Sequence, residues 1–200
     1  DERRQAFRQH HAYLQETQMT ALIIFTLGSL LVVWLSRKAL RRPGRHGFYR
    51  FFVWEAILAL FVMNQEPWGE QPFSPHQIAS WILMSISIYL VIRGHGALRQ
   101  QGAASEMRGD GDLYEFEKTT QLVTSGIFAY IRHPMYASLL ALAWGAFFQA
   151  PSWLGVALAT FASFFLLLTA RADEMECLAY FGEPYQRYMA QTRRFIPHIF

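Results

Sequence analysis

The chain has 200 residues, of which 52% are hydrophobic and only 16% are charged, and its formal net charge is +3. A soluble domain of this size carries about a quarter charged residues, so the composition favours one membrane domain over residues 1–200. The single cysteine, Cys177, excludes an internal disulfide and a multi-cysteine zinc site. No two of the seven histidines stand four residues apart, so we expect no metal.

Five apolar segments predict an all-α integral membrane protein with about five transmembrane helices. They cover residues 19–35, 48–63, 78–92, 135–148 and 153–170. Pro151 lies in the short connection between the last two, which we therefore expect to form a helical hairpin. Because several runs are shorter than the roughly 20 residues of a full span, a bundle of buried soluble helices is the alternative.

The basic residues predict how the spans are oriented. Lys and Arg gather in residues 37–50, in residues 93–132 and after residue 171, whereas the loop 64–76 has none and carries Glu66 and Glu70. Since basic loops stay in the cytosol, we expect the N-terminus outside and the long loop and C-terminal tail inside, although Arg3, Arg4 and Arg8 oppose this orientation. The domain thus divides into three N-terminal spans (1–92), a cytosolic loop (93–134) and a hairpin with a catalytic tail (135–200).

The first apolar segment is interpreted as a retained anchor. The chain begins at Asp1 rather than methionine, so we expect the natural start to lie upstream. No small-residue cleavage site follows the segment, which ends before Arg37 and Lys38.

A short segment before the fourth apolar run could bind an anion. Gly126 permits a backbone conformation that other residues resist, and Pro134 fits the first turn of a helix. Arg132 and His133 would then lie at a helix N-terminus, where amide donors and the helix dipole favour a carboxylate. The alternative is a helix start with basic residues at the lipid headgroups.

Two groups of acids need an explanation. Asp173, Glu174 and Glu176 follow the fifth segment, where the helix dipole disfavours them, so either the helix continues or they bind a cation such as an ammonium group. A solvated face that pairs with Arg171 or later bases is the alternative. Glu55 lies inside the second segment and is a functional candidate, unless it pairs with Arg50 or with a serine of the third segment.

The tail from residue 180 to residue 197 interleaves aromatic and charged residues. It predicts a Gly-Pro turn followed by an amphipathic helix at the membrane surface. We expect no role in binding nucleic acid.

Over residues 113–200 an ordered set of motifs resembles the isoprenylcysteine carboxyl methyltransferase and phospholipid methyltransferase superfamily. The motifs are LVTSGIF (122–128), RHPMY (132–136), DE (173–174), FGEPYQRY (181–188) and TRRFIP (192–197). The resemblance implies a helical membrane fold in which the cytosolic loop and the C-terminal helix form a pocket for S-adenosylmethionine. By that resemblance the cofactor-binding residues are Thr120, Gln121, Leu122, Val123, Gly126, Phe128, Tyr130, Arg132, His133, Pro134, Met135, Tyr136, Asp173 and Glu174.

The chain departs from the superfamily at two positions. Asp173 stands where relatives usually have glutamate. The carboxyl methyltransferases place an arginine four residues before that acid, where this chain has Thr169, and Arg171 lies on a different helical face. A prenylcysteine carboxylate is therefore less favoured as the substrate than an amine, a thiol or another lipid nucleophile.

The resemblance implies an integral membrane methyltransferase that moves a methyl group from S-adenosylmethionine to a lipophilic or small-molecule acceptor at an O, N or S atom. We expect Glu55, Glu174 and Arg194 to be catalytic, and Glu55, Glu174 or His133 to accept a proton from an amine or a thiol. An NADPH-dependent membrane reductase of sterols or enones is one alternative, because such proteins carry a similar Arg-His-Pro-x-Tyr segment. A non-enzymatic membrane scaffold is the other.

Overall fold

The computed structural model describes residues 2–65, 72–102 and 120–197, and the described residues are almost entirely helical. The expected acids Glu66 and Glu70 and most of the loop before residue 120 lie outside these ranges. The elements are α1 (Glu2–Leu40), α2 (His46–Met63), α3 (Pro75–Gln101), the 3-10 helix η2 (Gly126–Ala129), α4 (Pro134–Gln149), α5 (Trp153–Phe181) and α6 (Glu183–Gln191).

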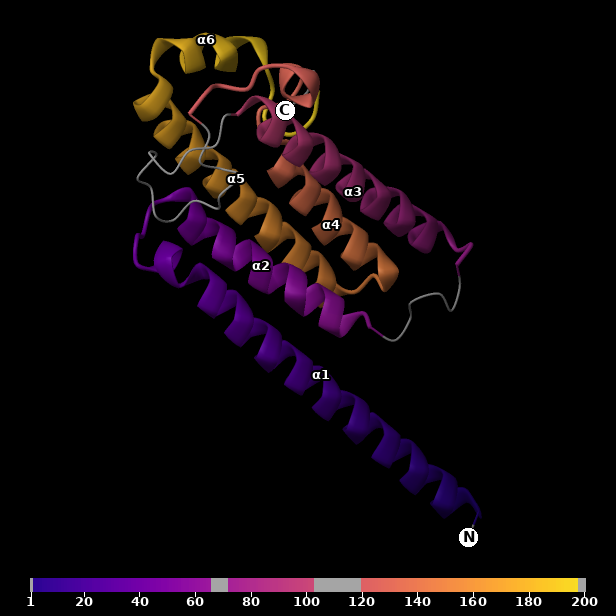
Figure 1. Cartoon of the computed structure of the whole chain (residues 1–200). Coiled ribbons are helices and arrows are strands. Elements are labelled where there is room, and N and C mark those ends of the chain that lie inside the picture. The colour runs from indigo at the N-terminus through magenta and orange to yellow at the C-terminus, as the bar shows by residue number, and fades with distance from the viewer. Residues whose placement is uncertain (1, 66–71, 103–119, 198–200) are drawn as a thin grey trace.

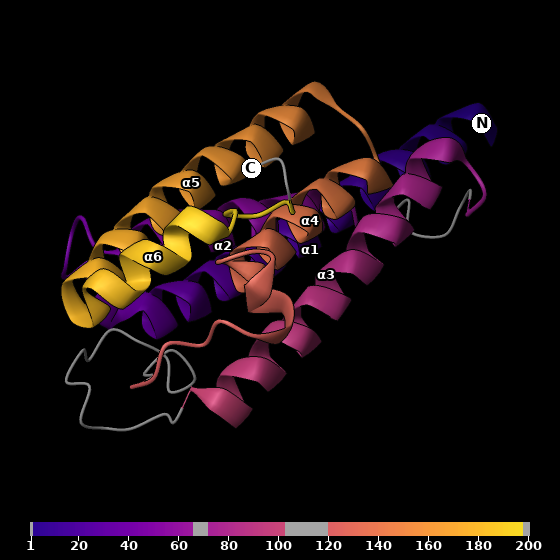
Figure 2. The same ribbon diagram turned by 90° about the horizontal axis from the view of Figure 1, so that it is seen from above.

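The long helices lie side by side, and α6 crosses one end of the bundle (Figure 1). Helix α4 packs against α2, α3 and α5, while α1 lies at the edge and packs against α2. The view from above shows α3 and α5 on either side of α4 (Figure 2). The α4–α5 hairpin is therefore confirmed, with α4 as the interior helix.

Four helices of the described residues are long and apolar enough to cross a membrane, namely α1, α2, α3 and α5. The expectation of about five spans is thus confirmed for four. Helix α4 has 16 residues, which gives a length of about 24 Å against a hydrocarbon core of about 30 Å.

Polar side chains of neighbouring helices satisfy the C-terminal end of α4. The Asn64 amide donates to the carbonyl oxygen of Ala146 at 2.7 Å, and the Ser80 hydroxyl donates to that of Gly145 at 2.6 Å. The last four carbonyls of a helix have no partner within it, so the bond from Asn64 to Ala146 allows α4 to end among its neighbours. Gly145 also lets α3 approach closely, since a Cβ there would lie 3.0 Å from the Met84 side chain.

Three helices extend well beyond their apolar segments. Helix α1 already begins at Glu2, so the polar residues before position 19 are helical. Helix α3 continues to Gln101, so the first nine residues of the expected cytosolic loop are helical. Helix α5 continues past the acids to Phe181 and ends at Gly182, whose positive φ of 64° suits glycine. The helix therefore continues past the acids, which lie beyond the apolar part that ends at Ala170.

The amphipathic helix expected in the tail is α6, but its apolar side faces the protein. Tyr185 and Tyr188 are buried, whereas Gln186 and Arg187 on the other side are exposed. The predicted contact of this helix with the membrane surface is therefore wrong for its apolar side.

Candidate active site

The segment before α4 has the backbone that its sequence predicts. Gly126 begins η2 with a φ of 63°. Pro134 occupies the first turn of α4, and His133 is the residue that precedes that turn. Tyr188 of α6 donates its hydroxyl to the carbonyl oxygen of Phe128 at 2.7 Å, which fixes η2 against the tail.

The C-terminal segment runs parallel to this stretch and is hydrogen-bonded to it. Ile131 and Arg193 form an isolated parallel bridge. The amide of Arg132 donates to the carbonyl of Arg193 at 2.7 Å, and that of His133 donates to Arg194 at 3.1 Å. Residues about 60 positions apart in the chain are thereby fixed together at the N-terminus of α4.

Glu174 connects α5 to both of these segments. Its Oε1 accepts from Arg132 Nη2 at 2.9 Å and its Oε2 accepts from Arg194 Nη2 at 2.8 Å, while its side chain is only 5% exposed. Burial opposes ionisation, yet hydrogen bonds from His133, Arg194 and Arg132 hold the pKa of this carboxyl well below its usual range. Both oxygens are therefore occupied by guanidinium groups.

Asp173 is in a different situation although it is the next residue. Its side chain is 24% exposed, and Oδ2 lies 3.4 Å from Nδ1 of His133. Burial opposes its ionisation, but a hydrogen bond from His133 and the charges of His46 and His133 lower its pKa. Asp173 is thus an ionised carboxylate with a part of its surface open. We call Arg132, His133, Asp173, Glu174 and Arg194 the ion-pair cluster.

His133 lies between the two acids. Its Nε2 is 3.4 Å from Glu174 Oε1, and its ring stacks on Tyr136 at a centroid distance of 5.2 Å. Burial disfavours the imidazolium, but hydrogen bonds and the negative charges of Asp173 and Glu174 outweigh it and raise the pKa of His133. The protonated form of this histidine is therefore favoured.

A separate apolar cluster lies outside the apolar part of the bundle. Its buried members are Val123, Phe128, Tyr185 and Tyr188, and we call it the aromatic cluster. Cys177 of α5 packs against it, and the Cys177 thiol is 3.7 Å from Asp173 Oδ1. The aromatic cluster and the ion-pair cluster are therefore neighbours.

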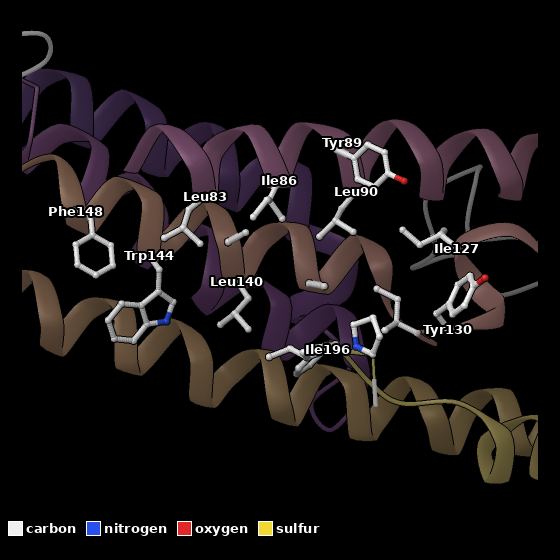
Figure 3. A pocket seen from close by; sticks show the side chains of 15 residues that line it. Leu83, Ile86, Tyr89, Leu90, Ile127, Tyr130, Leu140, Trp144, Phe148 and Ile196 are labelled. Atoms are coloured by element: carbon white, nitrogen blue, oxygen red, sulfur yellow. The ribbon is translucent and has the colours of Figure 1, made fainter. Parts of the chain in front are cut away.

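A groove of about 650 Å³ runs between α3 and α4 (Figure 3). Apart from the tyrosine hydroxyls and the indole of Trp144, its side chains are hydrocarbon: Leu83, Ile86, Tyr89, Leu90, Ile127, Tyr130, Ile131, Ala137, Leu140, Ala141, Trp144, Phe148, Phe195, Ile196 and Pro197. Ile131 and Phe195 line one end and directly adjoin Arg132 and Arg194 in the sequence. One end of the groove is thus beside the ion-pair cluster.

A comparison with models of known protein families shows to which family the chain belongs. Residues 76–183, which are 108 of the 200 residues, match the phospholipid methyltransferase family. The chain belongs to that family. No curated protein and no solved structure matches it.

Members of the phospholipid methyltransferase family are S-adenosylmethionine-dependent enzymes of membranes. This chain is therefore a multi-pass membrane methyltransferase that uses S-adenosylmethionine, and the superfamily resemblance is confirmed. The reductase and scaffold alternatives are not supported.

The residues of the site suit this cofactor. S-adenosylmethionine carries an ammonium group and a cationic sulfonium, and the partly open Asp173 carboxylate is a matching counter-charge. The aromatic cluster next to it contains rings of the kind that bind cations and bases.

The remaining cofactor candidates lie around these clusters. The amides of Thr120 and Gln121 donate to the Gly102 carbonyl at 3.0 and 3.3 Å. Leu122 packs on the aromatic cluster, and Tyr130 lines the groove. Pro134 and Met135 pack against Gly94 of α3, where a Cβ would be 3.1 Å from the Met135 sulfur, and Gly126 lines a hollow of about 320 Å³ beside Arg93.

Glu55 is not brought to this site. The Ser29 hydroxyl of α1 donates to Glu55 Oε2 at 2.8 Å, so both partners expected from the sequence, Arg50 and a serine of the third segment, are wrong. Glu55 is nine residues from His46 at the start of α2, a distance of about 13 Å along the helix.

The sequence analysis missed the contribution of α2. His46 is buried and approaches Glu176, which accepts from its backbone amide at 3.0 Å and lies 2.9 Å from its Nδ1. Arg45 Nη1 is 3.4 Å from the same carboxylate. The available signal was that Glu176 stands three residues after Asp173 and so shares its helical face.

Proposed function

We propose that this membrane methyltransferase transfers the methyl group to a lipophilic acceptor whose hydrocarbon part occupies the groove between α3 and α4. The observation that carries the proposal is that a hydrocarbon-lined groove ends beside charged side chains. An acceptor with an apolar tail and a polar nucleophilic group fits this arrangement, because the tail can occupy the groove while the polar group lies beside the charged side chains.

The cofactor, when bound, supplies a methyl group on a positively charged sulfur. The protein's part is to align the acceptor and to exclude water. We propose that Asp173 binds the cofactor's ammonium group and that Val123 and Phe128 contact its apolar parts. The residues from Thr120 to Tyr136 named from the family resemblance remain predictions.

Arg194 is the member of the ion-pair cluster that we assign to the acceptor's polar group. Its side chain is 25% exposed, and it precedes Phe195 and Ile196, which line the groove. Thr169 is fully buried and donates to the Phe165 carbonyl at 2.8 Å, so it offers no charge to a carboxylate acceptor.

An amine or thiol acceptor must also lose a proton. Glu174 is unsuited as the base because two arginines occupy its oxygens. In its neutral form His133 can accept the proton of the acceptor, and the two neighbouring carboxylates stabilise the imidazolium that results. We therefore propose His133 as the proton acceptor and Glu174 as a residue that positions the arginines.

The placement of charge supports a cytosolic site. The basic turn between α1 and α2 contacts α5 through Arg45 and Glu176, so it lies at the same end of the bundle as the ion-pair cluster. Because basic turns stay in the cytosol, we propose that this end is cytosolic and that the N-terminus is outside.

The test is transfer of tritiated methyl from labelled S-adenosylmethionine into a host lipid extract, with identification of the labelled product. A matched pair of variants tests the groove: Ala141→Trp fills it, while Ala157→Trp adds the same side chain to the exposed face of α5. We expect Ala141→Trp to lower transfer to the lipid by about tenfold, or about 1.4 kcal/mol, with unchanged affinity for S-adenosylhomocysteine. Equal transfer by the two variants would rule out the groove as the acceptor site.

A further inference from the structure

Tyr185 is a largely buried tyrosine whose hydroxyl has no hydrogen-bond partner among the described residues. The residue is only 4% exposed, and its ring is held between Phe181 and Tyr188 at centroid distances of 6.4 and 5.8 Å. Within residues 2–65, 72–102 and 120–197 the hydroxyl makes no hydrogen bond, whereas that of Tyr188 donates to Phe128. The hydroxyl oxygen is not fully enclosed by protein atoms, so a ligand can reach this donor.

The neighbours of Tyr185 connect it to the open carboxylate. Cys177 packs on the aromatic cluster that contains Tyr185, and its thiol contacts Asp173 Oδ1 at 3.7 Å. Burial raises the pKa of the Tyr185 hydroxyl, and the nearby thiol of Cys177 and the charges of Asp173 and Glu174 raise it further. The hydroxyl therefore keeps its proton and is a permanent donor.

The Tyr185 hydroxyl is a donor and the neighbouring Asp173 carboxylate is an acceptor, and together they suit the α-amino acid group of a ligand. An α-amino acid carries an ammonium and a carboxylate on the same carbon, and the first pairs with an acceptor while the second pairs with a donor. The amino-acid end of S-adenosylmethionine is such a group.

We propose that Tyr185 binds the carboxylate of the amino-acid end of S-adenosylmethionine, with the ammonium of the same end facing Asp173. The assignment rests on the family's cofactor and gives one residue of α6 a specific role in the pocket that the resemblance implies. It also explains why a tyrosine with no structural hydrogen bond is placed inside the protein.

The experiment compares Tyr185→Phe with Tyr188→Phe, which removes a neighbouring hydroxyl that does make a structural hydrogen bond. Affinities of the purified full chain are measured by calorimetry for two probes, S-adenosylhomocysteine and 5′-methylthioadenosine, of which the second lacks the amino-acid end. Unfolding temperatures without ligand are measured in parallel.

We expect Tyr185→Phe to weaken S-adenosylhomocysteine by about tenfold or more, the loss of one hydrogen bond to a charged group. Its affinity for 5′-methylthioadenosine and its unfolding temperature should stay at the wild-type values. Tyr188→Phe, which loses the hydrogen bond to Phe128, should instead unfold at a lower temperature than the wild-type chain.

Three results would overturn the proposal. Wild-type affinity of Tyr185→Phe for S-adenosylhomocysteine would mean that the hydroxyl does not contact the cofactor. An equal loss for both probes would assign Tyr185 to the nucleoside instead. Absence of S-adenosylhomocysteine binding by the wild-type chain would reject the whole cofactor site. A wrong role for Tyr185 alone is distinguished from this, because the wild-type chain would then still bind S-adenosylhomocysteine.

Discussion

At the scale of single residues, Asp173 and Glu174 show how neighbours in sequence take different roles. Both are ionised carboxylates on α5, but Glu174 faces two arginines and is 5% exposed, whereas Asp173 faces His133 and is 24% exposed. The sequence predicts both as ligands because it does not reveal which acid the tail arginine reaches. That choice depends on the pairing of residues 193 and 194 with the segment before α4.

The two acids therefore make a prediction about stability and binding. Glu174→Gln leaves Arg132 and Arg194 without a counter-charge, so we expect a loss of about 3 kcal/mol in the free energy of unfolding. Asp173→Asn should cost about 1 kcal/mol or less but lower the affinity for S-adenosylhomocysteine strongly. Thermal unfolding and calorimetry of the two variants measure this, and equal effects of both substitutions on both quantities would contradict it.

At the scale of elements, the N-terminal half of the chain contributes contacts to the site, although most of this half lies before the residues that match the family. The match begins at residue 76, yet His46 at the start of α2 contacts Glu176 on α5, and its charge acts on Asp173. Apolar runs and turn residues were sufficient to predict α2, α3 and the α4–α5 hairpin. They could not predict that a polar helix start would lie beside acids 130 positions away, because that contact depends on how α2 packs on α5.

This contact gives a prediction for Glu176→Gln. The substitution removes a negative charge that acts at Asp173, so the site attracts the ammonium group of the cofactor less strongly. We expect the affinity for S-adenosylhomocysteine to fall by about threefold, the scale of one partly screened charge. The control is Ser29→Ala, which breaks a tie between α1 and α2 away from the site and should lower only the unfolding temperature. If both variants bind S-adenosylhomocysteine equally well, the charge of Glu176 has no role in cofactor binding.

At the scale of the whole molecule, the helices form the scaffold and the last residues of the chain complete the site. The spans could be predicted from hydropathy because lipid imposes apolar runs of a set length. The site could be predicted only as a set of motifs, since its assembly depends on α6 turning back at Gly182 and placing residues 192–197 against the start of α4.

Removal of the tail should therefore separate fold from function. A chain that ends at Gln191 loses Arg194, the bonds from Arg132 and His133 to the tail carbonyls, and one end of the groove. Because the spans pack on one another without these residues, we expect wild-type helix content in detergent by circular dichroism together with loss of S-adenosylhomocysteine binding. The matched control lacks residues 1–18, the polar turns of α1 that precede the apolar segment, and should bind S-adenosylhomocysteine as the full chain does. Binding by the chain that ends at Gln191 would mean that the bundle holds the cofactor without Arg194 and the other residues of the tail.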